Sequence, residues 1–202
     1  MSRLEWLLSG FLGLLIISLA VVGLIWWRQS TSPPAAVQET AGSERERHSA
    51  QSAYELARPV AETWATGAQL VEASATWPTG SQFAPQGADW SFIFYAPDQD
   101  QIALITVAGS QATLFSSRRA DKAYLPVPRH YWTIDSPALI ELALINGGQQ
   151  FLREQAEATL RLKLMMDQTP AWQVELIGRE TGRTLRLLFD AGTSKLLYSE
   201  GG

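Results

Sequence analysis

The stretch WQVELIGRETGRTLRLLFDAGTSKLLY, residues 172–198, decides the fold. Apolar and polar residues alternate over 172–177 and again over 184–189, a pattern typical of β-strands that bury one face. Gly182 lies in the connection between them, where glycine can adopt the positive φ that a hairpin loop requires. The turn at 190–192 then leads into a last short strand. These residues therefore predict a small antiparallel meander.

The residues before this meander predict a helix and one more strand. Ser136 and Pro137 suit the cap and first turn of a helix, and apolar residues then follow a helical period up to Gly147–Gly148. Between Ala156 and Met166 the pattern changes to strict alternation, which indicates a strand with one buried face. The predicted order in this half of the chain is helix, strand, strand, strand.

The preceding half of the chain shows the same order. Residues 52–70 have a helical pattern that ends at Gly67. Strands are predicted at 69–77, 90–96, 101–107 and 108–115. Landmarks recur at nearly constant offsets: Trp90 and Trp172 are 82 positions apart, Gly67 and Gly148 are 81 apart, and Ala108–Ser110 and Ala191–Thr193 are 83 apart. These offsets favour a duplicated unit. The alternative is that the two halves are unrelated, because any domain made of a helix and a meander can place Gly and Trp at such positions.

A helix followed by a meander that ends in a DAGT turn resembles the PepSY domain family. The residues that carry the resemblance are Trp172, Asp190, Ala191, Gly192, Thr193, Leu196 and Leu197. The first half departs from the pattern, because Val107 stands where the aspartate is expected. The resemblance implies a non-catalytic binding or inhibitory module located outside the cytoplasm, often tethered to a membrane.

The predicted fold class is α+β, with one N-terminal transmembrane helix followed by a duplicated helix plus three- to four-stranded antiparallel meander. The expected segments are a transmembrane anchor (1–28), a flexible linker (29–47), a first PepSY-like unit (48–115), a connector (116–135) and a second PepSY-like unit (136–202). Each unit alone is too small to bury much of its surface. Two units packed edge to edge or face to face would share one core.

The N-terminal anchor is predicted from an uncharged run. The 22 residues from Trp6 to Trp27 contain no charge and are bracketed by Glu5 and Arg28. A helix of this length spans about 33 Å, enough to cross a hydrocarbon core of about 30 Å. A cleaved signal peptide is the alternative, but the apolar run continues past the small residues at 18–20. We therefore expect a single-pass protein of the cell membrane. The basic residues on the two sides of the run favour both orientations nearly equally, and the very short N-terminal tail and the Ser/Thr/Pro-rich segment after the run favour a domain on the extracytoplasmic side.

Small residues within the predicted anchor suggest a packing surface. Ser9, Gly13 and Ala20 fall near one helical face, where small side chains let a second helix approach closely. The alternative is that glycine is simply frequent in membrane helices. We predict that the anchor packs against other membrane subunits through these residues.

Composition excludes several kinds of site. The chain has no cysteine, which excludes disulfides and thiolate sites. From His48 onward it carries 12 Lys and Arg against 16 Asp and Glu. Because this balance is acidic, nucleic acid is not an expected partner. His48 and His130 are the only histidines, and no metal-binding, phosphate-binding or nucleophile-elbow motif occurs. Ser116 or Ser136 with His130 and Asp135 could be imagined as a triad, but no motif supports it. No cofactor, metal or catalytic residue is predicted.

The connector is the candidate contact surface. It gathers Arg118, Arg119, Lys122, Arg129 and Trp132, together with two tyrosines, within an otherwise acidic domain. Basic and aromatic side chains of this kind are typical of protein contacts. The alternative is a solvated loop whose aromatic residues pack into the core.

The sequence thus predicts a non-catalytic membrane protein rather than an enzyme. It would serve as an accessory or scaffolding subunit of a larger membrane complex, such as a respiratory or photosynthetic electron-transfer complex, with other membrane subunits and the lipid bilayer as partners. The alternative is a membrane-anchored PepSY-type regulator that binds a peptide, a peptidase or a small ligand. An unrecognised hydrolase is a third hypothesis.

Overall fold

The structure is a computed structural model that describes residues 48–77, 88–155 and 157–201. All of them belong to one compact unit, Glu44–Gly202. The predicted anchor and linker, including Ser9, Gly13 and Ala20, lie outside the described residues. Within the described part of the chain, no helix is both long and apolar enough to cross a membrane. The prediction of a single-pass protein therefore finds no support in these helices.

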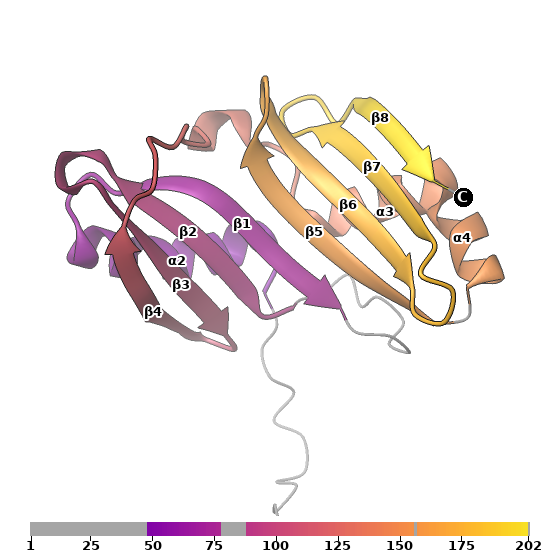
Figure 1. Cartoon of the computed structure of the whole chain (residues 1–202), viewed down its shortest axis with the longest axis horizontal. Helices are drawn as coiled ribbons and strands as arrows, with labels where there is room; N and C mark the ends of the chain where they lie inside the picture. The colour runs from indigo at the N-terminus through magenta and orange to yellow at the C-terminus, as the bar shows by residue number, and fades with distance from the viewer. Residues whose placement is uncertain (1–47, 78–87, 156, 202) are drawn as a thin grey trace, which may run out of the picture. The chain divides into compact units, whose positions relative to one another are not determined.

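Eight strands form a single antiparallel sheet in the order β4-β3-β2-β1-β5-β6-β7-β8 (Figure 1). The strands are β1 (Gln69–Trp77), β2 (Trp90–Ala96), β3 (Gln101–Ala108), β4 (Gln111–Arg119), β5 (Ala158–Met166), β6 (Pro170–Gly178), β7 (Thr184–Asp190) and β8 (Leu196–Gly201). The helices are α2 (Ala50–Trp64), α3 (Ser136–Ala143) and α4 (Gln149–Glu154). Short helical turns lie at η1 (Pro97–Gln99) and η2 (Arg129–Tyr131), and η3 (Leu144–Gly148) joins α3 to α4.

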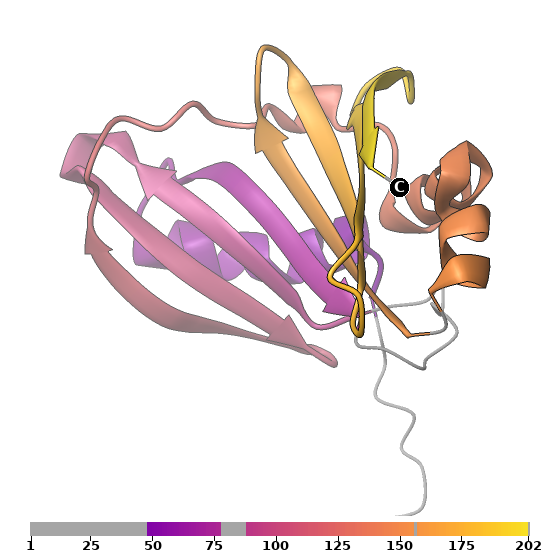
Figure 2. The same ribbon diagram turned by 45° about the vertical axis from the view of Figure 1, so that its right-hand side comes forward.

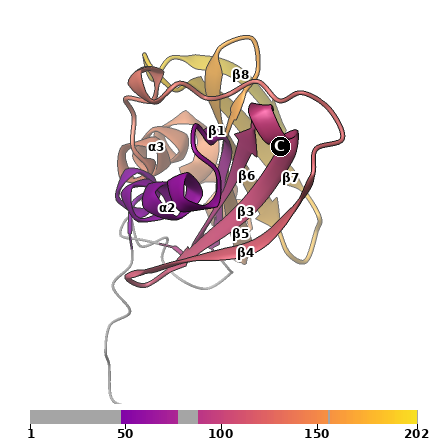
Figure 3. The same cartoon turned by 90° about the vertical axis from the view of Figure 1, so that its left-hand side faces the viewer.

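The helices cover one face of the sheet. Figures 2 and 3 show the sheet with α2 and α3 on the same side of it. Alternation along the central strands directs apolar side chains to this side: in β5, Leu160, Leu162 and Leu164 are buried, whereas Arg161 and Lys163 lie on the opposite face. Each large apolar side chain that is fully buried stabilises the fold by about 1.5–3 kcal/mol. The opposite face carries charged and polar side chains over β5 and β6, whereas over β2 and β3 it carries the buried side chains of Tyr95 and Ile102.

Aromatic side chains fill the layer between sheet and helices. The ring of Trp172 on β6 lies 6.2 Å from that of Trp90 on β2 and 5.9 Å from that of Trp132. The indole N–H groups of Trp132 and Trp172 both donate to the backbone oxygen of Ile134, at 2.9 and 3.2 Å. Because these polar atoms are paired, the indoles can be buried without an unsatisfied donor.

One carboxylate joins the starts of two helices. Asp135 is the N-cap of α3, and its Oδ1 accepts from the backbone N–H groups of Ser136 (2.7 Å) and of Gln51 in α2 (3.0 Å). The Ser136 hydroxyl oxygen accepts from the N–H of Ala50 at 3.0 Å. These bonds satisfy helix N–H groups that otherwise have no partner. The predicted cap was Ser136, and the structure moves that role to Asp135.

The second helical region is broken. The helix predicted to end at Gly147–Gly148 instead kinks there, where Gly147 has φ of +109°, and the chain resumes a helix as α4. A positive φ of this kind favours glycine. The glycine pair therefore bends the chain and does not terminate the helix.

The predicted fold class is wrong. Duplicated units, each a helix with a sheet of three or four strands, were expected behind a transmembrane helix, and the structure has one sheet of eight strands. The joining contact is β1 with β5, from Glu72↔Met165 to Trp77↔Leu160. It leaves β1 paired on both edges, which satisfies backbone groups that a free edge would expose. The helical parts also differ, since α2 is continuous whereas α3 and α4 are separated by the kink.

Candidate functional site: edge strand β4 and the segment that follows

The two adjacent arginines of the predicted contact surface lie on a strand. The connector was expected to begin at residue 116, but β4 continues through Arg119 and forms one edge of the sheet. Arg119 donates from Nε to the Asp100 carboxylate at 3.2 Å, and both side chains are well exposed. Arg118 is also exposed, and its Nη1 lies 3.4 Å from the backbone oxygen of Arg119. Both guanidinium groups therefore lie at the solvent-exposed end of an edge strand.

Lys122 and Arg129 are fixed beside aromatic rings. The ammonium of Lys122 lies 5.4 Å from the ring centre of Tyr124, and the guanidinium of Arg129 lies 5.1 Å from that of Trp132. Arg129 also donates to the backbone oxygen of Trp132 at 2.9 Å. Such cation–π contacts hold long side chains in place while their charge stays at the surface.

Trp132 is not a surface residue. Its side chain is 0% exposed and packs against Tyr54 and Trp172 in the core. The prediction that it contributes to a contact surface is therefore wrong, and the alternative of an aromatic side chain tucked into the core holds at this position. Its large apolar area explains this, because the space between helices and sheet needs large side chains.

Exposed apolar side chains concentrate where the basic ones lie. Seven large hydrophobic side chains are exposed among the described residues, and four of these fall between positions 114 and 131. They are Leu114 (39% exposed), Phe115 (71%), Leu125 (67%) and Tyr131 (55%). We call residues 111–131 the contact segment. Sequence analysis did not propose Leu114 and Phe115 as contact residues, because they fall in the strand predicted at 108–115 and not in the connector.

The charge of the contact segment opposes that of the rest of the chain. It holds four basic residues and one acid, Asp121, although the chain carries a net charge of −4. The Tyr124 hydroxyl donates to the Asp121 carboxylate, which lowers the pKa of Asp121 and raises the pKa of Tyr124. Asp121 therefore stays ionised and engaged within the segment. The segment as a whole is basic.

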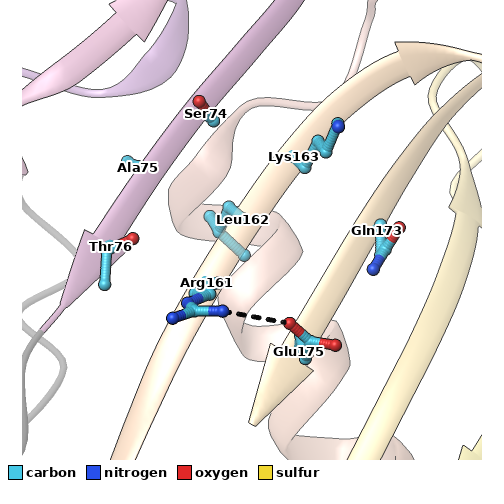
Figure 4. A pocket seen from close by; sticks show the side chains of 8 residues that line it. All are labelled: Ser74, Ala75, Thr76, Arg161, Leu162, Lys163, Gln173 and Glu175. Atoms are coloured by element: carbon cyan, nitrogen blue, oxygen red, sulfur yellow. Dashed lines mark ion pairs between the residues drawn. The ribbon is translucent and has the colours of Figure 1, made fainter. Parts of the chain in front are cut away.

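The sheet face opposite the helices holds a shallow hollow of about 210 Å³ (Figure 4). It is lined by Ser74, Ala75, Thr76, Arg161, Leu162, Lys163, Gln173 and Glu175. Its charged groups pair with one another and with neighbours: Arg161 with Glu175 at 3.8 Å, and Lys163 with Glu72 at 2.8 Å. Glu175 also pairs with Arg186 at 3.0 Å. These contacts form a cross-strand ladder of opposite charges, which stabilises a solvated sheet face.

A second hollow, of about 260 Å³, lies between the kinked helix and the C-terminal strands. Phe151 and Leu185 form its apolar part, and the pair Arg183–Glu154, at 3.3 Å, lies beside them. The carboxylate that lines it, Glu154, is engaged in this ion pair. We assign it no chemistry.

The residues of the imagined triad do not form a catalytic arrangement. Asp135 and Ser136 bond to helix N–H groups, and the His130 ring packs on that of Tyr131, with ring centres 4.3 Å apart. Ser116 lies on the exposed strand β4. Among the described residues, no three His, Cys, Asp or Glu side chains are grouped as metal ligands.

Asp190, which carries the family resemblance, stabilises a turn. Its Oδ1 accepts from the backbone N–H of Thr193 (2.7 Å), from the Thr193 hydroxyl (2.9 Å) and from the N–H of Gly192 (3.0 Å). These bonds favour the carboxylate and lower the pKa of Asp190, with the N–H of Thr193 contributing most. The DAGT sequence thus fixes the connection from β7 to β8.

Comparison with known proteins gives little beyond this geometry. No protein-family model matches the chain, and no curated protein matches it. Among solved structures, the chain is similar to the crystal structure of a "putative lipoprotein" from Clostridium difficile 630, with a TM-score of 0.47 and 9% sequence identity. The match covers 74% of this chain and 92% of that one. A TM-score below 0.5 does not establish a shared fold.

Proposed function

We propose that the Glu44–Gly202 unit is a non-catalytic protein-binding module that serves as an accessory subunit of a larger, membrane-associated assembly. The observation that carries this proposal is the contact segment, where exposed apolar side chains and basic side chains occur together. Interfaces are enriched in aromatic residues and arginine, and side chains of both kinds are exposed along residues 114–131 of this chain.

The fold presents these side chains from a rigid support. Phe115 lies on β4, which pairs with β3 along its length, and the chain beyond β4 is fixed by a bond from the Val127 N–H to the Leu70 oxygen at 2.7 Å. The ring contact between Tyr95 and Tyr124, at 5.7 Å, adds a second attachment. Pre-organised side chains lose less conformational entropy on binding. Such a surface suits the docking of a partner protein.

A binding role also agrees with how the polar groups are used. Asp135 and Ser136 bond to helix starts, Asp190 to a turn, and Glu175 to two arginines. Each of these groups has a structural partner that explains its position. The uncharged run at 6–27 supports association of the protein with a membrane.

Site-specific photo-crosslinking tests the proposal. A photoreactive phenylalanine replaces Phe115 or Leu125 in the full chain, expressed in its native membranes, and replaces Ile145 as the control. Ile145 is 75% exposed but lies outside the contact segment. We expect Phe115 and Leu125 to yield the same crosslinked protein and Ile145 to yield none. Equal crosslinking from all three positions, or none from Phe115 and Leu125, contradicts the proposal.

A further inference from the structure

We infer that β4 accepts an acidic, extended segment of the partner protein as an additional antiparallel strand of the sheet. This inference rests on the proposed function and gives the partner a chemistry. It combines three observations on the same strand: an unpaired edge, exposed apolar side chains at its middle and a basic end.

The edge is available for backbone pairing. Among the described residues β4 ends the sheet and pairs only with β3, so alternate residues direct their N–H and C=O groups away from the sheet. Every residue of β4 except Ala112 is exposed. Every neighbouring pair in the sheet is antiparallel, from β1–β2 to β7–β8. An extended peptide that joins such an edge gains main-chain hydrogen bonds, while side chains provide selectivity.

A bulge limits the length of the added strand. The register shifts between Leu104 and Ile105, which pair with Ser116 and Leu114, so Phe115 is the extra residue and its side chain is exposed. A bulge twists an edge and prevents long, flat pairing. The occupant is therefore a short segment that places an apolar residue near Phe115.

Charge decides what kind of segment fits. The sequence QATLFSSRR of β4 contains no acid, and its last two residues, Arg118 and Arg119, are followed by Lys122. The only ion pair that these three residues form in the described part of the chain is Arg119–Asp100, which is solvent-exposed and exchangeable. An antiparallel strand places its N-terminal residues opposite Arg118 and Arg119. Carboxylates belong at that end of the partner segment.

The same charges disfavour a second copy of this chain. Two β4 strands paired with each other would bring two arginine pairs to the joint edge without any carboxylate from either strand. An acidic partner segment supplies the missing charge, whereas a second β4 adds more of the same sign.

The test uses two fluorescein-labelled peptides that are as long as β4. One peptide begins with two glutamates and the other with two lysines. In both peptides, valine and threonine alternate over the remaining residues. Fluorescence anisotropy measures binding to the purified full chain. Hydrogen exchange reports which backbone amides become protected. We expect saturable binding of the glutamate peptide, with a dissociation constant below about 1 mM, slowed exchange within residues 111–119, and no binding of the lysine peptide.

A charge-reversed protein makes the test selective. In the R118E/R119E variant the glutamate peptide should bind about tenfold more weakly or not at all, and the lysine peptide should now bind. The matched control is R153E/K195E, which changes the charge equally at exposed positions on α4 and after β7. Binding should be unchanged in the control. A glutamate peptide with N-methylated backbone amides should not bind, because it cannot pair with the edge.

Several results would overturn the inference. These are no binding of the glutamate peptide, equal binding of both peptides, binding that survives R118E/R119E, and protection outside β4. A concentration-dependent dimer that protects β4 without peptide would assign the edge to a second copy instead. None of these results affects the photo-crosslinking test at Phe115 and Leu125. The inference can therefore fail while the proposed function is still supported by the crosslinks.

Discussion

Asp135 shows how one side chain can hold two helices. Its carboxylate accepts from an N–H at the start of α3 and from another at the start of α2. Both helix dipoles favour a negative charge at this point. The residue would be classed as a loop aspartate from the sequence alone, since its second helix lies 84 positions away in the chain.

Replacing Asp135 by alanine should destabilise the fold. We expect the free energy of unfolding to fall by about 1–3 kcal/mol, because the two N–H groups lose their acceptor. Asp135→Asn keeps an acceptor oxygen and should cost less. Denaturant unfolding followed by tryptophan fluorescence measures the change, with the exposed Asp98→Ala as control. Equal stability of Asp135→Ala and Asp98→Ala would refute this role.

Asp190 should make the free energy of unfolding depend on pH in the acidic range. The hydrogen bonds from Thr193 and Gly192 lower its folded-state pKa below the ordinary 3.8. A lowered pKa contributes stability that is fully present above the unfolded-state pKa and is lost as the pH falls through the folded-state value. The stability difference between wild type and Asp190→Asn should therefore shrink below about pH 4. A difference that stays constant from pH 6 to pH 2, roughly the range over which carboxylates titrate, would contradict this assignment.

At the scale of elements, β4 and the residues that follow it contain aromatic side chains of two kinds, one exposed for contact and one buried in the core. Phe115 lies on the exposed side of the edge strand, whereas Trp132 closes the segment and is buried in the core. Both are aromatic, and the sequence predicted Trp132 in the contact surface and Phe115 in the last strand of the first unit. Burial depends on which elements pack over a residue, and the local pattern does not contain that information.

Substitutions should distinguish the two roles. Phe115→Ser should change the free energy of unfolding by no more than about 0.5 kcal/mol, yet weaken association with the partner. Trp132→Ala should cost about 3–5 kcal/mol through the cavity that it leaves. Thermal and denaturant unfolding measure stability, and crosslinking from Leu125 measures association. A large loss of stability in Phe115→Ser would show that its side chain serves packing.

The individual strands could be predicted because alternation is a local property. Strands at 69–77 and 90–96 were predicted with the bounds that the structure has, and β6 was placed within two residues. The pairing of β1 with β5 could not be predicted, because period-two patterns do not name a partner strand. The kink at Gly147 was misread for a similar reason, since glycine either ends or bends a helix according to what packs beyond it.

At the scale of the molecule, the β1–β5 pairing makes one core. The cluster of buried residues runs from Ala50 in α2 to Phe189 in β7 without a break. The strands on either side of this pairing therefore depend on each other, and the parts before and after the contact segment are not expected to fold alone.

Fragments test this interdependence. Residues 48–128 and 129–202, expressed separately, should each lack a cooperative unfolding transition, whereas the Glu44–Gly202 unit should show one transition by both circular dichroism and fluorescence. Mixing the fragments should restore structure, because β1 and β5 regain their partner. A cooperative transition in either isolated fragment would show that the halves are independent domains.

The most direct test of the protein-binding role is native electrophoresis after purification from native membranes in mild detergent. Wild type and the control R153E/K195E should migrate with a large complex, and R118E/R119E should migrate as the free protein while keeping wild-type stability. Wild-type protein that migrates alone would contradict a binding role for the contact segment, and R118E/R119E that stays in the complex would contradict a binding role for the basic end of β4.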